Sequence, residues 1–144
     1  IGPIGPMLIG GVEVDADRGL EGTSDADVAL HAVADAILGA AAMGDLGSHF
    51  PSSDERWQDA DSSELLGEVV TMAATQGLLV DSIDVTIIAQ TVRISPHREA
   101  MRQKLADLLQ LPIARVSVKA TTTDGMGYLG QDEGIAAVAV AVLN

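Results

Sequence analysis

The run at residues 135–143 constrains the fold more than any other part of the sequence, because every residue in it is apolar. A strand with one face in water alternates apolar and polar residues, whereas a continuously apolar strand is typical of one buried on both faces. We therefore predict that this run is a strand within a sheet that is covered on both sides.

The rest of the sequence predicts helices and strands around that sheet. The pair Gly10-Gly11 indicates a bulge or a close backbone approach within a first strand at 7–14. Asp61 to Glu64 resemble a capping box at the start of a helix, and Pro96 fits the first turn of another. Helices are predicted at 27–44, 61–77 and 96–111, and further strands at 83–89 and 115–120. This order indicates an α/β (α+β) sandwich with one mainly four-stranded sheet covered by helices.

Size and composition favour a single domain with a core of small side chains. The chain has 144 residues, and 47% of them are hydrophobic, yet it contains only one Trp, one Tyr and one Phe. The core must therefore consist of Ala, Val, Leu and Ile, which leave a modest apolar area per residue. We expect additional burial in an oligomer interface.

The net charge of −13 limits the partners of the chain. It argues against nucleic acid, whose phosphates require a basic surface, and against anionic membrane surfaces. No apolar run reaches the length that spans a bilayer, and without cysteine there is no disulfide or thiol chemistry. Because no basic-then-apolar leader is visible, we expect a cytoplasmic protein of bacterial type; a removed plastid targeting segment is also compatible with the sequence.

The stretch 23–35 reads as a loop that enters a helix. Ser24 or Asp25 can cap this helix, and Asp27, His31 and Asp35 follow one another at intervals of four, so they form a polar row. Such a row suits a metal ligand with a carboxylate that orients it. On these residues alone, an ordinary amphipathic helix with one solvated face is the simpler interpretation. The predicted apolar stripe consists of Val28, Ala32, Val33, Ala36, Ile37 and Ala40.

Four stretches in order carry a resemblance to a known family. Residues 23–36 resemble the metal-binding helix of the 2-C-methyl-D-erythritol 2,4-cyclodiphosphate synthases, which reads His-Ser-Asp-Gly-Asp-Val-x-x-His-Ala-x-x-Asp-Ala. Residues 44–51, 120–124 and 130–134 match further motifs of that family in the same order. The resemblance extends from about residue 6 to the C-terminus, and together the four motifs are far more specific than any one of them.

The resemblance implies a homotrimer whose sites lie between neighbouring subunits. The implied reaction is an intramolecular phosphoryl transfer in non-mevalonate isoprenoid biosynthesis. The 2-phosphate of 4-diphosphocytidyl-2-C-methyl-D-erythritol 2-phosphate attacks the β-phosphorus of the diphosphate, and CMP leaves. Two alternatives remain open: a non-catalytic trimeric relative that binds nucleotide or metal, and a structural trimer that binds metal.

The resemblance also implies two kinds of metal ion. His31 is the implied ligand of Zn²⁺ or a similar divalent metal. The family supplies further ligands from an Asp-Val-His motif near the N-terminus, which this sequence does not contain. We therefore expect residues 1–144 to be a single domain without its first strand and its metal-motif loop. Asp124 is the implied ligand of Mg²⁺ or Mn²⁺ bound with the substrate diphosphate.

The substrate residues follow from the same matches. Asp45, Thr122 and Asp124 are the implied catalytic residues. The implied substrate-binding residues are Thr23, Ser24, Asp45, Gly47, Ala89, Arg93, Ile94, Ala120, Thr121, Thr122, Thr123 and Gln131. For the threonine run by itself, β-propensity at a strand end is the simpler interpretation.

Four positions differ chemically from the family pattern. Thr23 replaces a phosphate-binding His and offers a hydrogen bond without charge. Gln131 replaces an Arg and removes a cation, and Asp124 replaces the longer Glu. Arg93 replaces a Lys, which keeps the positive charge but changes its geometry.

Overall fold

The computed structural model describes residues 1–20, 26–51, 53–54 and 61–144. Its strands are β1 (Met7–Ile9), β2 (Val12–Asp15), β3 (Val80–Ile88), β4 (Val116–Thr121) and β5 (Ala136–Leu143). Its helices are α1 (Val28–Ala40), α2 (Leu46–His49), α3 (Ser62–Thr75), α4 (Arg98–Leu109) and α5 (Gly127–Gly130), with short 3-10 turns at η2 (Ser95–His97) and η3 (Ile113–Arg115). The mixed α/β architecture agrees with the prediction from the sequence.

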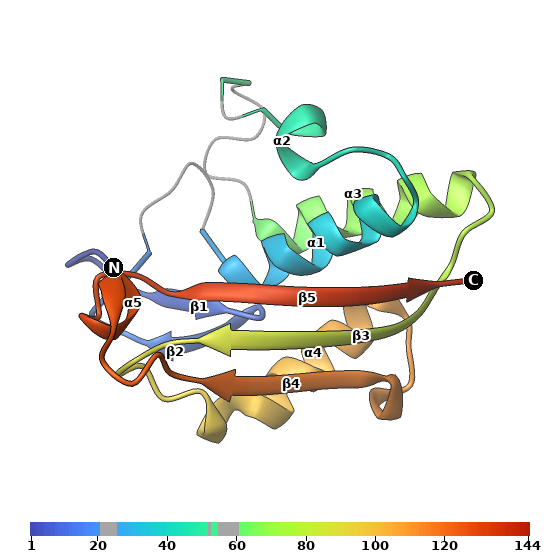
Figure 1. The fold of residues 1–144 in the computed structure, drawn as a ribbon. Helices are drawn as coiled ribbons and strands as arrows, with labels where there is room; N and C mark the ends of the chain where they lie inside the picture. Colours follow the sequence, from blue (N-terminus) through green and yellow to red (C-terminus); the bar gives the residue numbers. More distant parts are fainter. Residues whose placement is uncertain (21–25, 52, 55–60) are drawn as a thin grey trace.

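The described strands form a three-stranded sheet in the order β4-β3-β5 and a separate two-stranded hairpin of β1 and β2 (Figure 1). The prediction of one mainly four-stranded sheet is therefore wrong for the part of the chain that the structure describes. In the sheet, β3 runs parallel to β4 and antiparallel to β5. The carboxyl ends of β3 and β4 consequently lie at the same edge as the start of β5.

Residues 7–14 fold as a hairpin, which corrects the prediction of a single bulged strand. Gly10 and Gly11 have φ angles of 63° and 75°, a pair of left-handed residues typical of the two-residue turn that reverses a strand. A Cβ atom on Gly11 would lie 2.8 Å from Cγ of Lys104, so side-chain size is restricted there as well. The glycine pair thus makes the turn between β1 and β2.

The side chain of Asp27 joins this turn to the beginning of α1. Its Oδ1 accepts hydrogen bonds from the backbone N–H of Leu30 at 3.0 Å and of Gly10 at 2.9 Å. Its Oδ2 accepts from the N–H of Gly11 at 2.7 Å. The bond to Leu30 makes Asp27 the observed cap of α1. Because Asp27 is fully buried, it does not belong to a solvated polar row. Ser24 and Asp25, the predicted caps, lie outside the described residues.

The buried face of α1 is displaced from the predicted stripe, and the helix ends earlier than expected, at Ala40. The buried residues are Ala29, Leu30, Val33, Ala34, Ile37 and Leu38. Only Val33 and Ile37 belong to both sets. In a helix this rich in alanine, the apolar pattern does not determine which face is buried.

Helices α1, α3 and α4 cover one face of the sheet (Figure 1), and the core lies between them and that face. Helix α3 begins where the sequence predicts, because Oδ1 of Asp61 accepts the N–H of Ser63 at 2.8 Å. Helix α4 follows Pro96 in η2 and ends at Leu109, and its C-cap residue Gln110 is left-handed. No helix in the described ranges combines the length and apolarity needed to cross a bilayer.

The opposite face of the sheet is open in the single chain. On β5, Ala139, Ala141 and Leu143 pack against the core, whereas Val138, Val140 and Val142 are 58%, 61% and 50% exposed. The prediction that the run 135–143 is buried on both faces is therefore wrong for an isolated chain. The run lacks polar residues on either face, but one chain covers only one of them.

We predict that Asp27→Ala lowers the free energy of unfolding by about 3 kcal/mol, because it leaves buried N–H donors of the hairpin turn and of α1 without an acceptor. Urea unfolding measures this loss. Asp61→Ala is the matched control, since Asp61 is an exposed helix cap and its removal should cost only about 1 kcal/mol. Equal losses in the two variants would contradict a special role for Asp27.

Candidate active site

The end of β3 brings together several of the predicted substrate-binding residues. Ile88 pairs with Thr121 of β4 and with Ala136 of β5, and the N–H of Ala89 donates to the carbonyl of Thr121 at 3.0 Å. The loops 89–94 and 121–134 therefore leave the sheet side by side. We call these two loops, together with the strand ends from which they leave, the sheet edge.

In loop 89–94, buried apolar residues alternate with exposed polar ones. Ala89, Val92 and Ile94 are buried, whereas Thr91 and Arg93 are exposed. The apolar residues anchor the loop to the core and leave the Arg93 guanidinium in solvent. Both Arg93 and Ile94 thus lie in the loop that the sequence predicts. The Arg93 side chain faces solvent, and the Ile94 side chain is buried in the core.

The threonine run forms a turn that presents the Asp124 carboxylate. The N–H of Asp124 donates to Oγ1 of Thr122 at 3.1 Å, and the same hydroxyl lies 3.5 Å from Oδ1 of Asp124. Thr123 donates its hydroxyl to the carbonyl of Met126 at 2.7 Å. Asp124 has a φ of 54°, a conformation that Asp adopts more readily than most residues. Ala120, Thr121 and Asp124 are exposed, so this turn is open to a ligand.

Two glutamine side chains hold the residue that follows this turn. The N–H of Gly125 donates to Oε1 of Gln90 at 3.2 Å, and Nε2 of Gln131 donates to the carbonyl of Gly125 at 3.2 Å. Gln131, where the family pattern has a cation, thus contacts a backbone carbonyl in this chain. These bonds connect loop 89–94, the Asp124 turn and the segment before β5.

Asp15, Arg18, Thr91 and Asp132 form a polar group, here called the Arg18 cluster, that analysis of the sequence did not find. Arg18 Nε lies 2.8 Å from Oδ2 of Asp15, and Arg18 Nη1 lies 3.0 Å from Oδ2 of Asp132. The Thr91 hydroxyl donates to that same oxygen at 2.6 Å. The spacing of Asp15 and Arg18 was the one local signal, whereas Asp132 is 114 residues from Arg18.

The hydrogen bonds of the Arg18 cluster favour its charged forms. The backbone N–H and guanidinium of Arg18, together with the N–H of Asp17, lower the pKa of Asp15 to about 2. The Thr91 hydroxyl, more than Arg18, lowers the pKa of Asp132. The hydrogen bond to Asp15 raises the pKa of Arg18. The cluster is therefore ionised at neutral pH.

A second group of predicted site residues lies on the helices. The hydroxyl of Ser62, at the start of α3, is 2.9 Å from Nε2 of His31 in α1. Asp35 accepts the N–H of Leu46 at 2.7 Å, which holds α2 next to α1. Asp45 caps α2 by accepting the N–H of Ser48 at 2.9 Å. His31, Asp45 and Gly47 thus belong to the α1–α3 layer, and Thr23 and Ser24 lie outside the described residues.

The described ranges contain no group of three or more His, Cys, Asp or Glu side chains that could hold a metal ion. His31 and Asp124 each offer one donor of a suitable type, an imidazole for zinc and a carboxylate for magnesium. A protein zinc site needs at least three ligands from side chains, and the described residues offer one. They do not by themselves form a complete zinc site.

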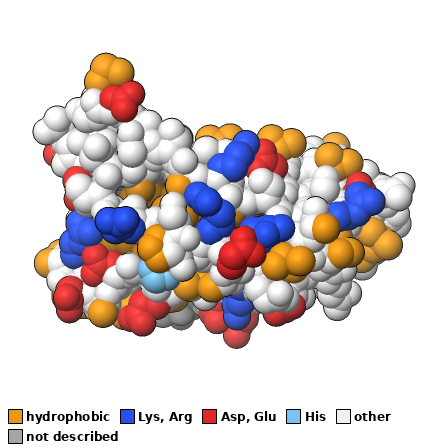
Figure 2. Space-filling model, turned by 90° about the horizontal axis from the view of Figure 1, so that it is seen from below, with side chains coloured by type: hydrophobic (Ala, Val, Ile, Leu, Met, Phe, Trp, Pro, Cys, Tyr) orange, Lys and Arg blue, Asp and Glu red, His pale blue; other side chains and the backbone are white. Residues whose placement is uncertain are grey.

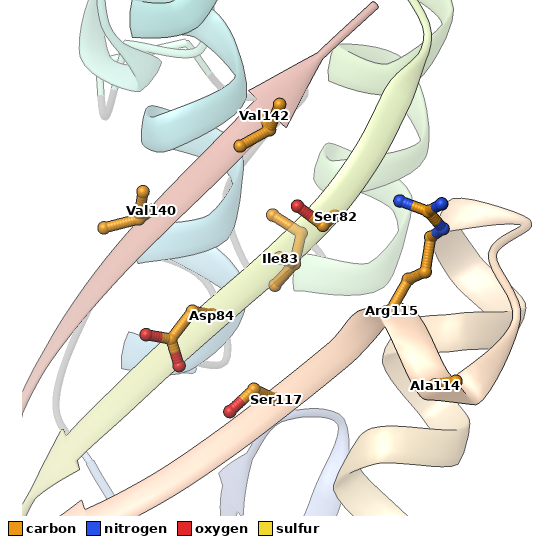
Figure 3. Close-up of a pocket in the computed structure, with 8 residues that line it drawn as sticks. All are labelled: Ser82, Ile83, Asp84, Ala114, Arg115, Ser117, Val140 and Val142. Carbon is orange, nitrogen blue, oxygen red and sulfur yellow. The ribbon is translucent and has the colours of Figure 1, made fainter.

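A shallow hollow lies on the open face of the sheet, away from the sheet edge (Figure 3). It has a volume of about 680 Å³ and is lined by Ser82, Ile83, Asp84, Ala114, Arg115, Ser117, Val140 and Val142. Lys119 Nζ lies 2.8 Å from Oδ2 of Asp84, whereas Oδ1 of Asp84 is buried and accepts no hydrogen bond from the described residues. The hollow combines apolar surface with a few charged groups.

The surface seen from below, on the side of β4, carries charges of both signs. Lys and Arg side chains there are interspersed with Asp and Glu and with hydrophobic groups (Figure 2). On α4, Arg102 Nη1 lies 3.0 Å from Oε1 of Glu99. This mixture is unlike the continuous basic surface by which proteins bind nucleic acid.

Comparisons with known proteins agree with the motifs found in the sequence. A model of the YgbB family matches residues 2–144. The 2-C-methyl-D-erythritol 2,4-cyclodiphosphate synthase of Salinibacter ruber is 51% identical over 138 residues, which are 96% of this chain and 88% of that protein. The protein of the same name from Geobacillus sp. is also 51% identical, over 96% of this chain and 87% of its own length.

Solved structures of proteins with that name share the fold. One superposes with a TM-score of 0.88 at 30% identity, over 96% of this chain and 90% of its own. A form with bound CDP gives 0.88 at 29% identity, with the same coverage. The resemblance inferred from the four motifs is thereby confirmed, and the chain belongs to the YgbB family.

Proposed function

We propose that this protein converts 4-diphosphocytidyl-2-C-methyl-D-erythritol 2-phosphate into 2-C-methyl-D-erythritol 2,4-cyclodiphosphate and CMP, in the cytoplasm. The observation that carries the proposal is the convergence of loop 89–94 and the threonine run at the sheet edge. Relatives about half identical to this chain bear the name of that synthase, and a structural neighbour is a CDP-bound form.

In this reaction an oxygen of the 2-phosphate forms a bond to the β-phosphorus. The bond from that phosphorus to the oxygen bridging to the α-phosphate breaks, and CMP leaves with that oxygen. Catalysis of such a transfer rests on positioning and on offsetting negative charge. The backbone of loop 89–94 and the Thr122 hydroxyl are suited to hold the cytidine diphosphate, because they donate hydrogen bonds without net charge.

The metal assignments are part of this proposal. Asp124 would hold Mg²⁺ or Mn²⁺, which offsets diphosphate charge and polarises phosphorus–oxygen bonds when bound. His31 would supply one ligand to Zn²⁺ or a similar ion whose other ligands come from outside the described residues. Residues 1–144 would act as one domain in this proposal. Asp45 and Gly47 would contact the methylerythritol phosphate, and the sequence assigns the same role to Thr23 and Ser24.

We further propose that the active form is a homotrimer in which the open sheet faces meet. Val138, Val140 and Val142 form an exposed apolar row on β5. Cross-strand pairing sets Asp84 beside Val140 and Thr86 beside Val138, so the face also offers polar groups that fix the register between copies. The helical half of one site and the sheet edge of a neighbouring copy would then complete each other.

We predict that the protein, incubated with this substrate and Mg²⁺, releases CMP and the cyclodiphosphate, both measured by mass spectrometry. Asp124→Asn should lower kcat roughly 100-fold, because a neutral amide binds the divalent ion that offsets the diphosphate charge much more weakly than a carboxylate does. Asp107→Asn, on the exposed face of α4, is the matched control with full activity. CDP binding without turnover would instead favour a non-catalytic relative.

Nucleotide selectivity provides a second test of the sheet edge. Thr122→Ala should weaken CDP binding about tenfold in calorimetry with Mg²⁺, since removal of the hydroxyl leaves hydrogen-bonding groups unmet. Thr122→Ser retains the hydroxyl and should bind nearly as well as the wild type. If CDP, UDP, ADP and GDP bind equally well, the sheet edge is not a cytidine pocket.

The oligomeric state tests the role of the open sheet face. Val140→Asp places a charge in the apolar row and should convert a trimer into monomers of 14.8 kDa in sedimentation velocity. Leu79→Asp is the control, because Leu79 is 64% exposed outside this row. A wild-type chain that sediments as a monomer at every concentration would contradict the trimer.

A further inference from the structure

We propose that Asp132 is a positioning residue for loop 89–94, holding the loop through Thr91 and thereby raising the affinity for cytidine nucleotides. The inference rests on the proposed function, because that function makes the loop a cytidine site. It concerns a residue that none of the motif matches assigns to the substrate.

One carboxylate oxygen of Asp132 receives two donors from distant parts of the chain. The Thr91 hydroxyl donates to Oδ2 at 2.6 Å, and Arg18 Nη1 donates to the same oxygen at 3.0 Å. Arg18 Nη1 also lies 3.4 Å from the Thr91 hydroxyl oxygen. The three side chains therefore form a closed contact between the end of the hairpin, loop 89–94 and the segment before β5.

The cluster is fixed to the hairpin as well. Asp15 accepts from Nε of Arg18 at 2.8 Å with Oδ2 and from the backbone N–H of Arg18 at 3.0 Å with Oδ1. The first contact holds the guanidinium, and the second holds the backbone of the same residue. Arg18 thus presents Nη1 to Asp132 from a defined position.

Thr91 lies in the loop close to the exposed Arg93. Its neighbour Val92 is buried, and Gln90 accepts the N–H of Gly125 at 3.2 Å. Thr91 is the next polar residue and lies two positions before the exposed Arg93. The bond to Asp132 therefore restricts the part of the loop that leads into the exposed cation, so less ordering remains for nucleotide binding to achieve.

A surface ion pair alone would have little effect, since exposed pairs contribute about 0–1 kcal/mol. Two features distinguish this cluster. The side chains of Arg18 and Asp132 are 38% and 25% exposed, so both are partly withdrawn from solvent. The shortest contact is a hydroxyl on an ionised carboxylate, a class of hydrogen bond roughly twice as strong as a neutral one.

The test compares four variants of the full chain. Asp132→Ala removes the acceptor, and Thr91→Val removes the donor while keeping the shape of the side chain. Thr91→Ser keeps the donor. Asp17→Asn is the charge-matched control, because Asp17 is an exposed carboxylate next to Arg18 in sequence and belongs to no ion pair among the described residues.

Two measurements are made on each variant: amide hydrogen exchange of residues 89–94 without ligand, and CDP affinity by calorimetry with Mg²⁺. We expect Asp132→Ala and Thr91→Val to speed exchange in the loop and to weaken CDP binding about tenfold. Thr91→Ser and Asp17→Asn should match the wild type in both. A purely structural role would lower thermal stability without this rescue by serine.

If the amides of residues 89–94 exchanged in Asp132→Ala at the same rate as in the wild type, the inference would be wrong, whatever ligand the protein binds. If the wild type bound CDP and Asp132→Ala bound it with the same affinity, the inference would be wrong as well. If the wild-type protein bound no CDP, the proposed function would fail first, and with it the link to affinity. The exchange rates would then still decide separately whether Asp132 holds the loop.

Discussion

The buried carboxylate of Asp27 is the contact on which the arrangement of the other elements depends. Burial of an ionised carboxylate costs several kcal/mol unless hydrogen bonds replace the lost water. Here the replacement comes from backbone N–H groups at two places, the hairpin turn at Gly10 and Gly11 and the first turn of α1. The positive end of the helix dipole adds to this stabilisation. Because one side chain satisfies both elements, it fixes the hairpin relative to the helix.

This connection reaches both groups of site residues. His31 lies one helical turn beyond Asp27 on the same helix, and its Nε2 contacts the Ser62 hydroxyl at the start of α3. The same hairpin ends at Asp15, which holds Arg18 and, through it, Asp132. The small hairpin is thus bonded to the helical layer through Asp27 and to the segment before β5 through Asp15 and Arg18.

How much the sequence predicts depends on whether the signal is local. The cap at Asp61 and the turn at Pro96 depend on neighbouring residues, and the structure confirms both. The strand predicted at 83–89 is also present, but it begins earlier and runs from Val80 to Ile88. The Gly10-Gly11 pair was ambiguous, since glycines suit both a bulge and a reverse turn, and the φ angles decide for the turn. The open face of β5 was mispredicted because the composition of a strand does not reveal what covers it.

The same distinction applies to the candidate site. The residues at 89–94 and 121–124 could be assigned to the substrate from the sequence because they correspond to positions of the family. The structure adds that both segments follow β3 and β4, parallel neighbours that end at one edge of the sheet. The Arg18 cluster could not, because the ion pair between Arg18 and Asp132 joins residues more than a hundred positions apart. Nothing local to Asp132 indicates its partner, so only the tertiary structure reveals the contact.

The charge balance at the sheet edge explains why the proposed reaction requires bound cations. The protein carries a net charge of −13, and the substrate would add further negative charge. Arg18 is already engaged by Asp15 and Asp132, while Arg93 forms no ion pair with the described residues and is available to a phosphate. A single exposed guanidinium offsets little of a diphosphate in water. A divalent ion at the Asp124 turn would turn that carboxylate from a source of repulsion into a ligand, which makes an acidic protein compatible with an anionic substrate.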